Sequence, residues 1–263
     1  MRTTSTGAPQ GCVLSPLVFS LYTNDCTSTD PAVKLVKFAD DTTVIGLIKD
    51  GDESAYRQQV EQLELWCGRH NLGLNTLKTV EMIVDFRKHS SPQLPLTLSN
   101  CPVSTVETFK FLGITVSQDM KWEVNTISIL KRARQRMYFL RLLRKHGLPQ
   151  EVLRQFYTAV IESILCSSIT VWFGAATKKD KIRLQRTVRM AEKIVGSALP
   201  TLEDVHTARI KTRARKIVLD PPHPAHHLFQ LLASGRRYRS MHTKSSRHLN
   251  SFFPRAINSL NSH

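Results

Sequence analysis

Residues 1–116 alternate short apolar runs with polar turns, a pattern typical of mixed helices and strands. An apolar segment over residues 13–24 follows a loop rich in Gly and Pro and predicts a helix. Val33–Phe38 and Thr42–Ile48 have the composition of strands on either side of a short acidic bend, so they predict a tight hairpin. Residues 53–70 place apolar side chains at helical spacing and predict a second helix.

Shorter runs complete this part of the chain. Met82–Val84 and Phe109–Val116 are rich in residues that favour strands, whereas residues 90–95 and 100–102 contain turn formers. Helices and strands mixed in this way predict an α+β fold, in which an antiparallel sheet is backed by helices.

From about residue 124 the pattern becomes helical. Residues 126–146 and 150–165 repeat apolar side chains every three or four positions, and the second stripe is expected to be core. Thr177 with Asp180 forms an acidic variant of the capping box, which predicts the start of a helix that ends near Gly196. The predicted buried stripe of that helix consists of Leu184, Val188, Ala191 and Val195.

Charge also changes along the chain. The chain has 37 Lys and Arg residues against 21 Asp and Glu, a formal net charge of +16. Residues 1–120 hold 10 basic and 13 acidic residues, whereas residues 121–263 hold 27 basic and 8 acidic residues. A basic half of this size suits binding to the phosphates of RNA or DNA, although a basic protein can also favour anionic membranes or simply be soluble.

Composition argues against several classes of protein. With 41% hydrophobic residues the chain can bury a core. Its longest apolar stretch, residues 164–176, is too short to span a bilayer, and the N-terminus has no signal-peptide pattern. The five cysteines form no Cys-x-x-Cys pair, which argues against a zinc module and for a reducing compartment. We therefore expect no membrane partner and an intracellular location, cytoplasmic or nuclear.

The acidic bend between the two predicted strands is the first candidate for chemistry. Asp40 and Asp41 are adjacent there, and at the bend of a hairpin both side chains can turn toward one solvent-filled cleft. Such a pair favours hard divalent cations, which handle phosphates. The two residues also fit an ordinary solvated turn, because Asp is a common turn former.

Four sequence blocks occur in a fixed order around this bend. They are a Gly- and Pro-rich loop at residues 6–19, the bend Phe38–Thr42, the segment Asn71–Asn75 with Lys78, and the segment Phe109–Gly113. In this order and spacing the chain resembles the reverse transcriptases of non-LTR (LINE-type) retrotransposons, over essentially its whole length. The resemblance implies a remnant of a right-hand polymerase palm at residues 1–120, an all-α, thumb-like region at 121–200 and a basic, partly disordered C-terminal region at 201–263.

The resemblance also implies roles for individual residues. Asp40 and Asp41 match the acids that bind Mg²⁺, and Lys78 matches a basic residue that protonates the leaving pyrophosphate. The other matches are Gln10, Gly11 and Phe38 near the incoming nucleotide and template, and Phe111, Leu112 and Gly113 in the hairpin that grips the primer. Lys78 also fits an ordinary surface lysine, and Phe111 with Leu112 also fits a core.

One departure from the family pattern bears on activity. The family places its first catalytic Asp on a strand before the Gln10-Gly11 block, but residues 1–5 contain no acid, and Asp25 and Asp30 follow the block. The fingers and an endonuclease domain are also missing. Two metal ions about 4 Å apart need several carboxylate or phosphate oxygens. We therefore expect a truncated chain that is inactive alone and whose Mg²⁺ site is weak or empty. An intact protein of the same element is a candidate partner in trans. The oligomeric state is not indicated.

The basic half supplies candidate contacts to nucleic acid. A basic helix with an apolar stripe can lie along a duplex, as a polymerase thumb does, and Arg with Tyr in the tail can contact phosphates and unpaired bases. The candidates are Lys131, Arg132, Arg134 and Arg136 in the helix and Arg236, Arg237 and Arg239 in the tail. A solvated basic face and a poorly ordered tail fit the same facts. A non-catalytic nucleic-acid-binding protein acting through residues 121–263 is the second hypothesis.

A third hypothesis comes from another resemblance. Residues 122–172 are similar to a short helical module at the N-terminus of AlkB-like tRNA-modifying proteins. This resemblance makes dioxygenase and methyltransferase activity a third hypothesis. Iron and 2-oxoglutarate chemistry needs two His and a carboxylate. However, no His-x-Asp or His-x-Glu occurs in the chain, and no Gly-rich S-adenosylmethionine loop is visible. We interpret the shared segment as scaffold.

Overall fold

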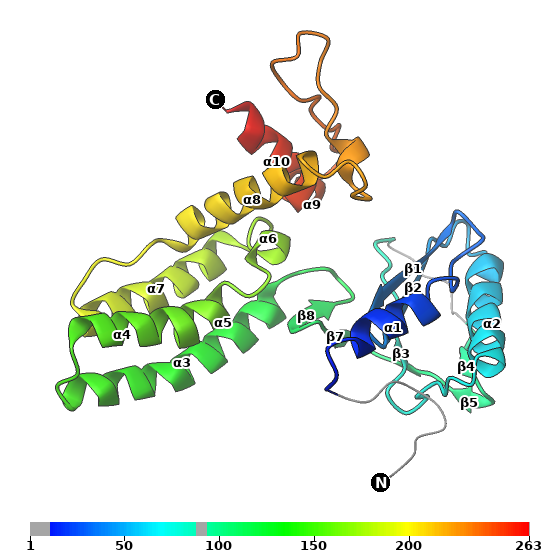
Figure 1. Ribbon diagram of the computed structural model, residues 1–263, viewed down its shortest axis with the longest axis horizontal. Helices are drawn as coiled ribbons and strands as arrows, with labels where there is room; N and C mark the ends of the chain where they lie inside the picture. Colours follow the sequence, from blue (N-terminus) through cyan, green and yellow to red (C-terminus); the bar gives the residue numbers. More distant parts are fainter. Residues whose placement is uncertain (1–10, 88–93, 263) are drawn as a thin grey trace. The chain divides into compact units, whose positions relative to one another are not determined.

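The chain folds as two compact units (Figure 1). The computed structural model describes residues 11–87 and 94–262, so the candidate residue Gln10 lies outside the described residues. The first unit is Met1–Val106 and the second is Glu107–His263. Helices and small sheets are mixed along the chain, as an α+β fold requires.

The first unit combines helices with short strand pairs. Its elements are α1 (Ser15–Tyr22), β1 (Val33–Phe38), β2 (Asp41–Gly46), α2 (Ser54–Arg69), β3 (Val80–Glu81), β4 (Thr97–Leu98), β5 (Cys101–Pro102) and β6 (Ser104–Thr105). The helices predicted over 13–24 and 53–70 are confirmed, and so is the predicted hairpin, which β1 and β2 form by antiparallel pairing.

Helix α2 packs against one face of the β1–β2 hairpin. A Cβ added at Gly46 would lie 2.7 Å from the Cβ of Tyr56, so strand and helix approach too closely for a side chain at this position. The Tyr56 hydroxyl donates a hydrogen bond to Glu81 Oε1 at 3.0 Å, which connects α2 to β3. The small core beside this contact consists of Val60, Leu96, Leu98 and Val103. The hairpin is therefore supported from the side of α2.

The strands do not form the single sheet that the pattern predicted. In the described residues they form four separate two-stranded sheets, and β3 pairs with β6 in parallel. The strand predicted over Met82–Val84 is wrong, because the pairing stops at Glu81, where its partner strand ends at Thr105. A strand without a neighbour to share its hydrogen bonds is not stable.

The segment Phe109–Val116, whose composition predicted strands, forms a hairpin, as the family resemblance implied for Phe111, Leu112 and Gly113. It is formed by β7 (Thr108–Phe111) and β8 (Ile114–Ser117), which pair in antiparallel register. Leu112 and Gly113 have φ values of +45° and +88°, and two consecutive positive φ angles are what a tight hairpin turn needs. The turn therefore reverses the chain at Leu112 and Gly113.

After this hairpin the second unit is helical (Figure 1). Its helices are α3 (Glu123–Lys145), α4 (Gln150–Phe156), the π-helix η1 (Tyr157–Glu162), α5 (Ser163–Leu165), α6 (Ile169–Trp172), α7 (Lys178–Val195), α8 (Leu202–Val218), the 3₁₀ helix η2 (His226–Leu228), α9 (Ser246–Leu249) and α10 (Phe252–Asn261). Helices α4, η1 and α5 follow one another without a break, so the helices predicted over 126–146 and 150–165 are confirmed. Within the described ranges, none of the helices has both the length and the apolar composition to cross a membrane.

Both predicted ends of α7 are confirmed. Thr177 Oγ1 accepts a hydrogen bond from the backbone N of Asp180 at 3.1 Å, which satisfies one of the free N–H groups at the start of the helix. Gly196 ends the helix with φ +78°, in the left-handed region that favours glycine. The predicted stripe of Leu184, Val188, Ala191 and Val195 is buried.

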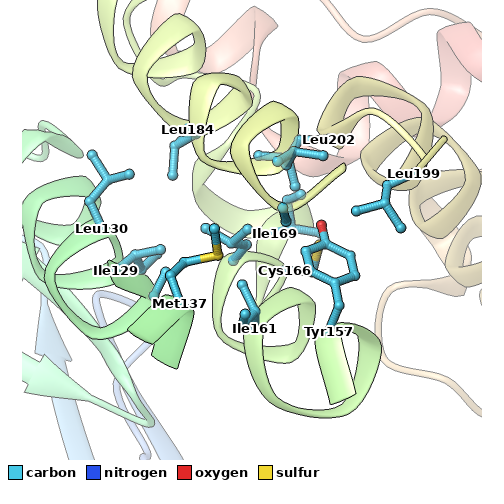
Figure 2. Close-up of a cluster of buried hydrophobic side chains, with 14 of the residues drawn as sticks. Ile129, Leu130, Met137, Tyr157, Ile161, Cys166, Ile169, Leu184, Leu199 and Leu202 are labelled. Atoms are coloured by element: carbon cyan, nitrogen blue, oxygen red, sulfur yellow. The ribbon is translucent and has the colours of Figure 1, made fainter. Parts of the chain in front are cut away.

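Helices α3, α4 to α6 and α7 enclose one apolar core. Figure 2 shows Met137 of α3, Ile161 of η1 and Leu184 of α7 in the same buried cluster. Leu153 and Tyr157 also belong to this cluster, as the stripe over residues 150–165 predicted. Burying apolar side chains contributes about 1.5–3 kcal/mol each, so this cluster is the main source of stability in the unit.

Residues 201–263 contain a second core. Helices α8 and α10 pack against each other, and η2 lies in the segment that connects them along the chain. The buried residues are Ile210, Ala214, Ile217, Phe229, Ala256 and Ile257. Leu231 and Tyr238 form an isolated antiparallel bridge, which closes the loop that carries Arg236 and Arg237.

Candidate functional site

The turn between β1 and β2 holds the two candidate acids. Phe38 pairs with Asp41 at the end of the antiparallel ladder, and Ala39 and Asp40 form the turn. Ala39 has φ +52°, in the left-handed region that residues other than glycine rarely adopt. Asp40 and Asp41 are both exposed. The two carboxylates therefore stand next to each other at the tip of a hairpin.

The hairpin has a covered face and an open face. Gly46 lies on the covered face, against α2. Residues paired directly across the ladder share a face, and residues alternate faces along each strand, so Asp41 shares the open face with Phe38, Val36 and Ile45. These three apolar side chains are exposed, and Phe38 is 62% exposed. The open face thus combines a carboxylate with an apolar surface.

Lys37 connects the hairpin to the loop that follows α1. Its Nζ donates a hydrogen bond to the carbonyl oxygen of Cys26 at 2.9 Å and another to that of Thr23. Carbonyl groups, and not the neighbouring acids, therefore bind this ammonium group. Within the described part of the chain, Asp40 and Asp41 form no hydrogen bond or ion pair through their side chains, which leaves both carboxylates available to a cation.

Two carboxylates supply only part of the shell of a hard divalent cation, which takes about six oxygen ligands. In the ranges that the structure describes, no group of three or more His, Cys, Asp or Glu residues could hold a metal ion. The hairpin residues therefore do not complete a metal site by themselves. Further oxygens can come from water, from nucleotide phosphates or from another polypeptide segment.

Two further candidates of the first unit lie in loops. Lys78 is exposed, and its backbone N donates a hydrogen bond to Asn75 Oδ1 at 3.1 Å, which fixes the loop after α2. It forms no ion pair with Asp40 or Asp41. Gly11 is exposed, and its φ of +82° lies in the region that favours glycine.

The candidate primer-binding hairpin belongs to the second unit. Phe111 is half-buried, and Leu112 at its tip is exposed. Ile114, just after the turn, is buried in the helical core, and the backbone N of Thr115 donates a hydrogen bond to Asn125 Oδ1 at 3.0 Å. The base of the hairpin is therefore fixed on α3, whereas its tip is open to solvent.

Most of the candidate basic residues are exposed. The exposed ones are Lys131, Arg134, Arg136, Arg236, Arg237 and Arg239. Arg132 differs, because it is half-buried and its Nε is enclosed without a hydrogen-bond partner. Tyr238, expected to stack on bases, instead packs edge-to-face on Phe229 with ring centroids 6.2 Å apart. The tail therefore offers charge at its surface and uses this tyrosine for packing.

A groove of about 710 Å³ lies between α3 and α7, and the sequence analysis did not indicate it. It is lined by Arg134, Lys179, Ile182, Arg183, Arg186, Thr187 and Met190. The signal was present in the sequence of α7, because Lys179, Arg183 and Arg186 recur at helical spacing beside the buried stripe.

Comparison with known families gives two matches. Residues 1–116 match the family described as reverse transcriptase (RNA-dependent DNA polymerase). This range includes the acidic hairpin, Lys78 and the candidate primer-binding hairpin. Residues 122–163, which form α3, α4 and η1, match the family described as the N-terminal part of alkylated DNA repair protein alkB homolog 8.

Curated relatives come from fruit-fly mobile elements. The chain is 29% identical to the probable RNA-directed DNA polymerase from transposon BS of Drosophila melanogaster, over 70% of this chain and 21% of that protein. It is 27% identical to the corresponding protein of the X-element of the same species, over 49% of this chain and 14% of that protein. The match to the RNA-directed DNA polymerase of mobile element jockey is 24% identical, over 68% and 20%.

The chain spans about a fifth of the length of most of these relatives. No solved structure matches it. The acidic hairpin, the ordered sequence blocks, the family match at residues 1–116 and the mobile-element relatives lead to one family, whereas the match at residues 122–163 is to another. These findings support a fragment similar to the reverse transcriptases of non-LTR (LINE-type) retrotransposons.

Proposed function

We propose that this chain is a part of a retrotransposon RNA-directed DNA polymerase that binds nucleic acid but does not extend primers by itself. Polymerases of this family use divalent metal ions. The observation that carries the proposal is the hairpin, where Asp40 and Asp41 have no third metal-binding side chain beside them in the described residues. A site with so few charged ligands binds divalent ions weakly, and two-ion phosphoryl transfer needs both ions held in place.

Within a completed polymerase we assign these residues the roles that the family resemblance gives them. Asp40 and Asp41 would hold divalent ions, which neutralise charge on the phosphates. Lys78, whose ammonium group is exposed, would donate a proton to the leaving pyrophosphate. The exposed tip at Leu112 would contact the primer. An intact protein of the same element is the partner that could supply the remaining ligands.

Primer extension on an RNA template with Mg²⁺ or Mn²⁺ tests the absence of activity. We expect no product above that of Asp40→Asn, which keeps the side-chain size and removes the charge. Asp220→Asn is the matched control, because it removes an exposed acid far along the chain from the hairpin. Extension by the unmodified chain that Asp40→Asn abolishes and Asp220→Asn retains would overturn the proposal.

Nucleic-acid binding is supported by charge. Residues 121–263 hold 27 basic residues against 8 acidic ones, and most of the candidate basic side chains are exposed. Each phosphate contact releases condensed counterions, so binding should weaken steeply as salt rises. Fluorescence anisotropy with labelled RNA and DNA at several salt concentrations measures this dependence. The double variant Asp40→Ala, Asp41→Ala should bind as tightly as the unmodified chain, and a chain that retains neither RNA nor DNA at low salt would refute this part.

We infer no dioxygenase or methyltransferase activity from the match at residues 122–163. That segment contributes Met137, Leu153 and Tyr157 to the helical core, which is the role of a scaffold. In the described ranges no cluster of three His, Cys or acidic residues is available for iron. Turnover of 2-oxoglutarate by the pure protein with iron would contradict this inference.

A further inference from the structure

We propose that the groove between α3 and α7 binds an unpaired segment of RNA or DNA. The inference rests on the proposed nucleic-acid binding. It adds the place where the nucleic acid binds and that the bound segment is single-stranded. The groove has about 710 Å³ of open space. Arg134 of α3 lies on one side, and a stripe of α7 from Lys179 to Met190 lies on the other.

Four cationic side chains line the groove, and most of them are not neutralised by a neighbouring acid among the described residues. In the described part of the chain, Arg134, Lys179 and Arg186 form no ion pair. Arg183 is anchored, because its Nη1 lies 3.0 Å from Oδ1 of the buried Asp180. One fixed and three unpaired cations along one groove match the regular negative charge of a phosphate backbone.

Two of the side chains that line the groove are apolar. Ile182 is 53% exposed, and Met190 is also exposed, although both lie on a helix that buries other apolar residues well. The flat faces of nucleobases are apolar enough to cover such side chains. In a duplex these faces are stacked inside the helix and only phosphates and groove edges are presented. The exposed apolar side chains of the groove are therefore useful to an unpaired strand and of little use to a duplex.

Tyr138 extends this surface along α3. It lies one helical turn after Arg134 on the same side of the helix and is 60% exposed. Its ring meets that of Phe139 edge-to-face, with centroids 5.5 Å apart, which restricts its orientation. An exposed aromatic ring beside cationic side chains is the arrangement on which bases of a single strand stack.

The test compares single-stranded and duplex oligonucleotides of one sequence, labelled with a fluorophore, in anisotropy titrations with the full chain. We expect tighter binding of the single strand. Arg186→Ala should weaken it about tenfold and reduce the slope of log affinity against log salt by about 0.7, because one phosphate contact is lost. Arg215→Ala on α8 is the matched control, since it removes an exposed arginine outside the groove.

Ile182→Ser separates the contribution of the apolar lining from that of the cationic lining. It should weaken single-strand binding several-fold while leaving the salt slope unchanged, because no charge is removed. Both substituted side chains are exposed, so the thermal unfolding of the variants should match that of the unmodified chain.

Several outcomes would overturn the groove assignment while nucleic-acid binding itself stands. They are equal or tighter binding of the duplex, an Arg186→Ala variant that behaves like Arg215→Ala, and competition by poly-glutamate as strong as that of the unlabelled single strand. The last result would mean that the groove recognises charge alone. If the unmodified chain binds no oligonucleotide, the groove assignment and the proposed nucleic-acid binding both fail.

Discussion

His206 on α8 is fully buried, and its polar ring lacks hydrogen bonds to the described residues. Neither ring nitrogen has a hydrogen-bond partner in the described structure, and the ring packs near that of Phe173 with centroids 5.1 Å apart. Burial, the largest cause, together with the nearby charges of Arg255 and Lys181, lowers its pKa to about 4. Glu203, whose Oε1 lies 3.9 Å from Nδ1, raises the pKa but does not outweigh these effects. The folded chain therefore holds a neutral imidazole.

Acid should destabilise the second unit through this residue. The pKa of His206 is about 4 when folded against an ordinary value of 6.5, so between these values the unfolded chain binds a proton that the folded chain excludes. The contribution to the free energy of unfolding is complete above pH 6.5 and is lost as the pH falls toward 4. At pH 5 the loss should be about 2 kcal/mol.

Urea unfolding at pH 7 and pH 5 measures this loss. His206→Leu keeps a similar volume and has no proton to bind, so its stability should fall less between the two pH values than that of the unmodified chain. Its stability at pH 7 should not be lower by more than about 1.5 kcal/mol, because the ring it replaces has no hydrogen bond to lose. Equal losses in both proteins would show that other groups set the acid sensitivity.

At the scale of single residues, the sequence predicts a residue's position in a local turn better than its burial or its neighbours in space. Asp40 and Asp41 could be singled out because their position at a bend is a local property. The burial of His206 could not be predicted, because it depends on Phe173, which lies on another part of the chain. Arg132 and Arg134 are equivalent in the sequence, yet only Arg134 reaches the groove. Which side of a helix is covered is decided by its neighbours.

Elements that depend on local signals were predicted well. The start of α7 is set by Thr177 and Asp180, three residues apart, and both ends of this helix agree with the prediction. The pair of β3 and β6 could not be predicted, because each strand has two residues and exists only through a distant partner. The single palm sheet expected from the family resemblance is likewise absent from the described residues, where the strands pair two by two.

The contact between α2 and β2 can be tested at Gly46. An added Cβ would lie 2.7 Å from Cβ and 2.9 Å from Cδ2 of Tyr56, atoms close to the helix backbone that cannot move alone. Gly46→Ala should therefore push α2 from the hairpin and cost about 1–3 kcal/mol of stability. Thermal unfolding followed by circular dichroism should show a lower midpoint.

Gly73→Ala is the control for this substitution. Gly73 has no atom within 4 Å of an added Cβ, so the same chemical change meets no steric obstacle there. Its unfolding midpoint should stay close to that of the unmodified chain. If Gly46→Ala also left the midpoint unchanged, the close packing of helix on strand that supports the acidic hairpin would be wrong.

At the scale of the whole molecule, charge is divided between the parts of the chain. Residues 1–120 are slightly acidic, with 13 acidic against 10 basic residues, and residues 121–263 carry most of the positive charge. The phosphate backbone of a nucleic acid should therefore contact residues 121–263. It should leave the acidic hairpin free when no divalent ion bridges the hairpin carboxylates and the phosphates. Chemical acetylation of lysines, measured by mass spectrometry with and without single-stranded RNA, reports which lysines the RNA protects.

RNA should protect Lys131 and Lys179, which lie on α3 and α7, and leave Lys34 and Lys49 of the first unit reactive. Lys78 distinguishes two modes of binding, because its assigned role places it near a nucleotide only when a metal site is assembled. With chelator present, Lys78 should react as fast as Lys34. Protection of Lys78 without divalent ions would mean that the first unit binds nucleic acid by itself. The prediction that the basic residues 121–263 bind the phosphates and leave the acidic hairpin free would then be wrong.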